Sequence, residues 1–238
     1  MPRSTKEPPV NSQARLELVR LLQLASPALP VGAYSYSQGL ESAIEAGTVR
    51  NADDARHWIA DMLNFSIARL EAPLWRRLHA AWSDQDMAAV REWNDWFLCT
   101  RETAELRAET LQMGYSLRRL VTALVEFDNA AVARLATLDE IAFPTAFTFA
   151  VREWKIPAAD ALAAYLWSWL ENQVMAAVKT VPLGQTDGQR LLAALSSDII
   201  IISNDESLKE ASLYSNYSHG LAIESSRHET QYSRLFRS

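Results

Sequence analysis

The sequence predicts an all-α protein, a single-domain multi-helix bundle around a central buried helix. Gly (7) and Pro (9) are sparse among 238 residues, whereas Ala and Leu are abundant and Trp occurs eight times. This composition favours a helical globular protein. Residues 158–181 (AADALAAYLWSWLENQVMAAVKTV) place apolar side chains on every side of one helix. Such a helix has to be surrounded by others, and most of the remaining chain shows helical spacing of apolar residues.

The central helix is bounded by prolines. Pro157 precedes its first turn, where a missing N–H is harmless, and Pro182 ends it. About 24 residues give a rod of roughly 36 Å, the width of a domain. A membrane span is the alternative, but Glu171-Asn172-Gln173 lie in its second half, and Asp160 and Lys179 lie near its ends. Charge and amide groups are costly in a bilayer, so a buried helix of a protein outside the membrane is favoured.

Other helices are expected on both sides of this one. In order, they cover 16–25, 35–46, 51–71, 73–82, the stretch from Asp84 through Phe97, 100–126, a short segment from Asp128, 145–154 and 187–197. The run Asp198–Ile202 suits a buried strand equally well, but no partner strand is visible, so helix is predicted. In the loop 182–189, Thr186 and Gln189 have the spacing of a capping box that opens the next helix.

The chain divides into three parts. Residues 1–12 are polar with three prolines and are predicted to be disordered. Residues 13–214 form the helical domain. Residues 215–238 are polar, end in a basic and aromatic stretch, and are predicted to be a flexible tail that orders on a partner.

Charge and cysteine content restrict the function. The net charge of −6 and the pI near 5.3 disfavour a nucleic-acid surface. A single cysteine, Cys99, cannot form an intramolecular disulfide and points to a reducing compartment. The N-terminus lacks the apolar core of a signal peptide, so a cytoplasmic location is expected. Cys99 itself is expected to be a buried apolar residue.

No pattern for catalysis or for a cofactor stands out. Neither glycine of the 182–189 loop is followed by Lys-Ser or Lys-Thr, so there is no P-loop. A Ser-His-Asp arrangement stays open, although no nucleophile-elbow pattern supports one. His57 with Asp61, and His219 with His228, are weak metal signals.

Three glutamates share one helix face and could line a metal site. They are Glu102, Glu105 and Glu109. A di-iron bundle needs Glu-x-x-His pairs, which the sequence lacks. A solvated face with ion pairs to Arg101 and Arg107 is therefore the favoured interpretation.

Two stretches suit the binding of other proteins. Pro27, Pro30 and Gly32 make a stiff loop that leads to Tyr34 and Tyr36, which are either core residues or recognition residues. The tail 227–237 (RHETQYSRLFR) mixes Tyr, Phe and three Arg, residue types that interface hot spots favour.

Four segments together resemble the urease accessory protein UreF family. They are 29–41 (LPVGAYSYSQGLE), 100–107 (TRETAELR) with Gln112-Met113-Gly114 after it, 182–189 (PLGQTDGQ) and 228–236 (HETQYSRLF). They occur in the family's order, and the resemblance runs from about Leu16 to the last residue. Residues 198–220 match least well.

The resemblance implies an all-α, homodimeric, cytoplasmic scaffold that is not an enzyme and has no cofactor. Such a scaffold binds UreD (also called UreH), recruits the GTPase UreG, and serves nickel insertion into the urease apoprotein. Partners of the nucleic-acid or membrane class are not implied. A regulator of UreG GTPase activity, and a helical metalloenzyme or nickel carrier, are the competing hypotheses.

The partner-binding residues follow from the same motifs. The tail, with Arg234 and Phe236, and the N-terminal segment would order against UreD/UreH. The loop 182–189 and the helix before it would serve the dimer and the UreG-facing surface. Carried over by motif, the set is Gly32, Tyr34, Ser35, Gln38, Glu41, Arg101, Glu102, Glu105, Lys179, Pro182, Gly184, Gln185, Asp187, Gln189, His228, Glu229, Tyr232, Arg234 and Phe236.

Overall fold

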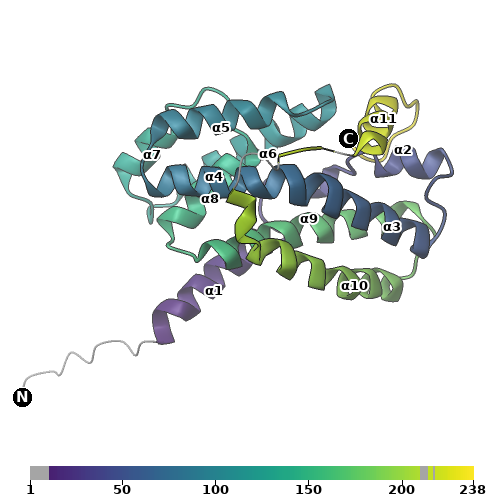
Figure 1. The fold of residues 1–238 in the computed structure, drawn as a ribbon, viewed down its shortest axis with the longest axis horizontal. Helices are drawn as coiled ribbons and strands as arrows, with labels where there is room; N and C mark the ends of the chain where they lie inside the picture. The colour runs from purple at the N-terminus through teal and green to yellow at the C-terminus, as the bar shows by residue number, and fades with distance from the viewer. Residues whose placement is uncertain (1–10, 210–213, 217) are drawn as a thin grey trace, which may run out of the picture.

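The computed structural model describes residues 11–209, 214–216 and 218–238, and these residues form helices and connecting loops without a β-strand. The prediction of an all-α fold is confirmed. Figure 1 shows the helices as a bundle from which α1 projects at one end, with the C-terminal helix α11 beside α2 at the other. Among the described residues, no helix is both long and apolar enough to cross a bilayer.

The chain forms eleven α-helices and three shorter or irregular helical segments within the described ranges. They are α1 (Asn11–Ala25), η1 (Ala33–Ser35), α2 (Leu40–Glu45), α3 (Ala52–Met62), η2 (Leu63–Glu71), α4 (Ala72–Ser83), α5 (Met87–Cys99), α6 (Ala104–Ala123), α7 (Asn129–Leu135), α8 (Phe143–Glu153), α9 (Ala158–Thr180), α10 (Gln185–Asn204), η3 (Glu206–Lys209) and α11 (His219–His228).

Helix α9 starts and ends where the flanking prolines predict. Pro157 is its N-cap residue, and Val181 follows its last residue, Thr180. Helices α10, α1, α2, α3 and α4 all pack against it. Among its side chains, Asp160, Met175 and Lys179 are exposed, and its second half borders a cavity that is described below.

Helices α3 and α4 form one continuous rod through the π-helical segment η2 (Figure 1). Asn51 caps the rod, since its side chain accepts the N–H of Asp54. Pro73, at the start of α4, lacks an N–H and cannot join the regular i→i−4 ladder. The π-helix, with its wider i→i+5 spacing, lies directly before this interruption. The sequence predicts a boundary between two helices at residue 72, and at this position the structure changes from the π-helix η2 to the α-helix α4.

The start of α10 differs from its prediction. The helix begins at Gln185 with Gly184 as its N-cap and no side-chain cap, so the capping box between Thr186 and Gln189 is wrong. Gly188, in the first turn of α10, packs closely on α9: a Cβ at this position would lie 2.9 Å from Val178 Cγ2.

The isoleucine run is helical, as predicted. Helix α10 continues to Asn204 and buries Ile199 and Ile202, whereas Ile200 and Ile201 face outward. Two other expectations are wrong. The helix expected from Asp84 begins only at Met87, and Asp86 caps it by accepting the N–H groups of Ala88 and Ala89. Cys99 is exposed rather than buried, because it lies on the outer side of the last turn of α5.

The C-terminal residues differ most from the expected flexible tail. Residues 219–228 form α11, which packs against α2, and the chain then returns to the start of α2 and to α6. His228 and Ser238 are fully buried, and Phe236 is only 6% exposed. Burial of these side chains and hydrogen bonds to the main chain hold the segment in place. Ordering on a partner stays a prediction.

Gly114 gives a direct test of the packing between α6 and the turn before α8. A Cβ at this position would lie 2.1 Å from the carbonyl oxygen of Ile141. Because main-chain atoms must move, we expect Gly114→Ala to destabilise the protein by roughly 1–3 kcal/mol or more in a denaturant titration.

Gly220 supplies the matched control, since it lies in α11 with open space around it. Gly220→Ala should be neutral or stabilising by up to about 1 kcal/mol. Equal stability of the two variants would contradict the close approach at Gly114.

Candidate functional site

Glu41, in the first turn of α2, binds the end of the chain. Its carboxylate oxygens accept the backbone N–H groups of Leu235 (2.7 Å) and Phe236 (2.9 Å). Gly39 lets α11 approach α2 this closely: its φ is +78°, and a Cβ there would lie 3.0 Å from the nitrogen of Ser225. The glycine therefore serves both the turn and the contact.

His228, at the end of α11, lies fully buried between two carboxylates. Its Nδ1 is 2.7 Å from Glu105 Oε2, and its Nε2 is 3.2 Å from Glu41 Oε2. Each ring nitrogen therefore lies within hydrogen-bond distance of one carboxylate. Removal of either carboxylate would leave a buried ring nitrogen without its partner.

Helix α6 and the tail each bind a glutamate side chain of the other. Glu105 Oε1 accepts a hydrogen bond from Arg234 Nη1 at 2.7 Å. In return, Glu229 Oε1 accepts the N–H groups of Ala104 (2.9 Å) and Glu105 (3.3 Å) at the start of α6. The first N–H groups of a helix have no partner within it, and the helix dipole favours a carboxylate there.

Glu109 is buried one turn further along α6. Gln38 Nε2 donates to its Oε1 at 2.7 Å, and Ser238 Oγ donates to its Oε2 at 2.9 Å. Burial raises the pKa of Glu109 to about 7, with a smaller increase from Glu71 and opposing effects from the two hydrogen bonds and from Arg101. This carboxyl therefore changes its charge near neutral pH.

The last residues also bind the loop before α2. The carbonyl oxygen of Ser238 accepts the N–H groups of Ser37 (2.6 Å) and Gln38 (3.0 Å) and the hydroxyl of Ser37 (2.5 Å). The N–H of Arg237 donates to the carbonyl of Ser35 at 2.8 Å. Below, "carboxylate row" means Glu41, Glu105 and Glu109, and "terminal segment" means residues 229–238.

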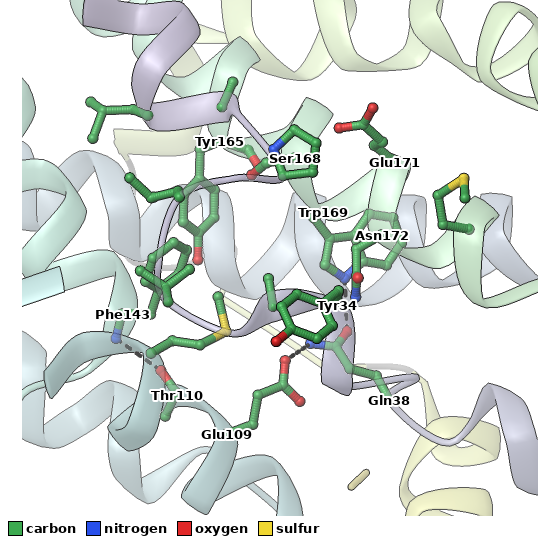
Figure 2. A pocket seen from close by; sticks show the side chains of 18 of the residues that line it. Tyr34, Gln38, Glu109, Thr110, Phe143, Tyr165, Ser168, Trp169, Glu171 and Asn172 are labelled. Carbon is green, nitrogen blue, oxygen red and sulfur yellow. Dashed lines mark hydrogen bonds between the residues drawn. The ribbon is translucent and has the colours of Figure 1, made fainter. Parts of the chain in front are cut away.

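A cavity of about 360 Å³ lies behind the carboxylate row, between the end of α1, the loop 26–38, α6 and α9. Figure 2 shows Gln38 joined to Glu109 within it. Trp169 Nε1 donates to Gln38 Oε1 at 2.7 Å. The wall also holds Glu71, which accepts a hydrogen bond from the Tyr165 hydroxyl and pairs with Arg101 at 3.4 Å.

Most of the residues predicted from the first and last motifs meet here. Ser35, Gln38, Glu41, Glu105, His228, Glu229, Arg234 and Phe236 belong to one hydrogen-bonded or packed cluster. Tyr34 is 63% exposed at the cavity, whereas Tyr36 is buried, so the two tyrosines divide the roles that the sequence left open. Gly32, with φ +79°, makes the turn that leads to them.

Other predicted residues lie around or outside this cluster. Arg101 lines the cavity, and so does Lys179, whose Nζ lies 5.6 Å from the centroid of the Phe236 ring. Glu102 accepts a hydrogen bond from Asn216 at 3.0 Å, and Tyr232 is fully exposed. Away from the cluster, Pro182 and Gly184 lie in the turn between α9 and α10, and Gln185, Asp187 and Gln189 lie at the start of α10.

The expectation of a solvated glutamate face on α6 is wrong. Glu109 is 7% exposed, and Glu105 pairs with His228 and Arg234. Arg101 and Arg107 do not pair with this face: Arg101 contacts Glu71, and Arg107 contacts Glu140 at 2.6 Å. The tail covers Glu105 and Glu109, whereas Glu102 lies before α6 and is exposed as expected. The sequence gives no local sign of the contact with the tail.

Sequence reasoning also missed residues that complete the site. Ser37, Ser238 and Glu224 were not singled out, although Glu224 accepts the Ser42 hydroxyl at 2.7 Å between α11 and α2. Leu235 was overlooked as an exposed residue, at 64%. The alternation of buried His228 and Phe236 with exposed Tyr232 and Leu235 follows from contacts that only the fold reveals.

The contacts of the site join the terminal segment to α2 and α6. In the described part of the chain, no group of three or more His, Cys, Asp or Glu side chains is placed to hold a metal ion. The ordering of α2, α6 and the terminal segment around one acidic row defines the molecule as an all-helical protein with an intramolecularly bound C-terminal segment.

Comparison with known proteins assigns the family. The UreF family model matches residues 49–196. The chain is 62% identical to the urease accessory protein UreF of Azoarcus sp. (strain BH72) over 226 residues, which covers 94% of this chain and 96% of the relative. It is 53% identical to that of Dechloromonas aromatica (strain RCB) over 224 residues, covering 94% and 98%. The chain belongs to the UreF family of urease accessory proteins.

Glu109 predicts a pH-dependent stability. Its folded pKa of about 7 lies above the ordinary value of 4.5, so the folded state retains a proton that the unfolded state releases between these values. This contribution to stability therefore falls as pH rises through that window, by at most about 1.4 kcal/mol per pH unit. Glu109→Gln should gain in stability relative to wild type from pH 5 to pH 8, measured by denaturant titration.

Glu45→Gln, at an exposed position on α2, is the matched control. It should leave the slope of stability against pH unchanged. A Glu109→Gln slope equal to that of wild type would show that Glu109 does not titrate in this range.

Proposed function

We propose that this chain is a non-catalytic, cytoplasmic scaffold for nickel insertion into urease. In this proposal it binds UreD/UreH, recruits the GTPase UreG, and the assembly acts on the urease apoprotein. Membership of a family named for urease accessory proteins supports the pathway. The observation that carries the scaffold role is the terminal segment, which is fixed by the carboxylate row and presents apolar side chains outward.

The UreD/UreH-binding surface is proposed to centre on the outer side of α11 and the terminal segment. Ile223 is 51% exposed, Leu235 is 64% exposed, and Tyr232 is fully exposed. Large exposed apolar and aromatic side chains on one ordered segment suit a protein interface. Arg234 and Phe236 act differently: they face Glu105 and the core, so they position the segment.

The UreG-facing surface is proposed to include the turn between α9 and α10. Pro182 and Gly184 are exposed in this turn, and Gln185 and Gln189 are exposed at the start of α10, where Asp187 pairs with Arg190 at 2.9 Å. A scaffold couples GTP hydrolysis to nickel release only if it binds two nucleotide states of UreG with different affinity. Nickel is the cargo that UreG brings to this assembly.

A homodimer completes the proposal. Helix α1 leaves Leu16, Leu18, Val19 and Leu22 between 43% and 62% exposed. Several exposed large apolar residues on one projecting helix (Figure 1) are characteristic of an interface. Two copies would give the assembly two equivalent surfaces for its partners.

The outward-facing residues provide the main test. Tyr232→Ser combined with Leu235→Ser should weaken binding to purified UreD/UreH by roughly tenfold or more, because hot-spot side chains each contribute about 1–2 kcal/mol or more. Binding is measured by isothermal titration calorimetry or by co-purification, and urease activation in cells should fall in parallel.

Ile201→Ser is the matched control, since Ile201 is 69% exposed on α10. It should leave binding to UreD/UreH unchanged. Undiminished binding by the Tyr232/Leu235 variant, with the helical circular dichroism of wild type, would reject this surface.

A further inference from the structure

One face of α1 leads directly into the cavity. Leu18, Leu22 and Ala25 follow the spacing i, i+4, i+7, which places them on the same side of the helix. Leu18 and Leu22 are 54% and 62% exposed, and Ala25 lines the cavity. An apolar stripe on the surface is thus continuous with the apolar walls of a hollow at its end.

Two charged groups lie at opposite ends of this stripe. Arg15 is exposed one turn before Leu18, on the same side of α1, and α1 projects from the body (Figure 1). Glu171 lies at the cavity, on α9 (Figure 2). Neither side chain has an ion-pair partner among the described residues. Burial raises the pKa of Glu171, as expected for a carboxyl that lacks a cation beside it.

This surface of one copy is complementary to the same surface of a second copy. In a two-fold symmetric, antiparallel pair of α1 helices centred between Leu18 and Leu22, position 15 of one copy faces position 25 of the other. Ala25 lies at the cavity, so Arg15 of one copy would arrive beside Glu171 of the other. The apolar stripes would cover each other at the same time.

We propose that α1 of a second copy of this chain packs antiparallel on α1, with Leu18 and Leu22 buried at the centre and Arg15 paired with Glu171 across the two-fold axis. The inference rests on the homodimer of the proposed function and specifies its interface. The pairing occurs twice in each dimer, as every contact of an isologous interface does. The cavity of each copy is then closed by the partner's α1.

The mass of the full-length protein in solution tests the interface, by light scattering after size exclusion and by sedimentation at several concentrations. Wild type should be a dimer. Leu18→Glu combined with Leu22→Glu should be a monomer, because the dimer would bury glutamates of the two copies against each other. The monomer should be folded, because both positions are exposed in the single chain. Ile201→Glu on α10, 69% exposed, is the matched control and should remain dimeric.

Charge reversal tests the ion pair separately. Arg15→Glu and Glu171→Arg should each weaken dimerisation by tenfold or more, since each places like charges together, and the double variant should restore it to within a few-fold of wild type. Failure of this rescue would overturn the pairing. A dimer that survives the two leucine changes would overturn the interface while leaving the homodimer intact. A monomeric wild type would overturn both, and binding of UreD/UreH to the Tyr232/Leu235 surface is measured independently.

Discussion

The buried contact of His228 with Glu41 and Glu105 holds together the parts of the molecule that the remaining features depend on. It joins residues 187 and 123 positions apart in the sequence. Through it, α2, α6 and α11 form one unit, although α2 and α11 are short helices that tertiary contacts have to stabilise. Loss of any one of these three side chains would leave a buried polar group without its partner. The contact is therefore specific to this arrangement.

The carboxylate row also decides which terminal side chains are available to a partner. Glu41 fixes the main chain at Leu235 and Phe236, and Glu105 fixes Arg234. With the main chain held by these anchors, Phe236 is buried and Leu235 is exposed. In the proposed function, the acidic row positions the segment and the apolar side chains bind. The tail therefore contains two groups of residues: some hold the segment against the domain, and the others are available to a partner.

Local signals in the sequence predicted most of the helices, but the single helix expected over 35–46 is wrong: a 3-10 turn, Ala33–Ser35, is followed by α2 only from Leu40 to Glu45. Prolines bound α9, and Asn51 and Asp128 cap α3 and α7 at or near the positions expected. The errors arise where residues distant in the sequence determine whether a side chain is buried. Glu109 has the spacing of a solvated helix face, but Ser238 and Gln38 cover it.

The sequence motifs contain most residues of the site, and the fold shows which contacts these residues make. Segments 29–41, 100–107 and 228–236 were recognised as a set, and the structure brings them together around the carboxylate row. The capping box at Thr186 is wrong because α10 already begins at Gln185, which places Thr186 inside the helix. Sequence patterns located the residues, but burial and pairing across more than a hundred positions assigned their contacts.

Amide hydrogen exchange of the terminal segment tests the central contact most directly. The N–H groups of Leu235 and Phe236, bound by Glu41, should exchange slowly in wild type and fast in Glu41→Ala, while the exposed stretch around Ser233 exchanges fast in both. Fast exchange at Leu235 and Phe236 in the wild-type protein, or protection that survives Glu41→Ala, would contradict a terminal segment held by the carboxylate row.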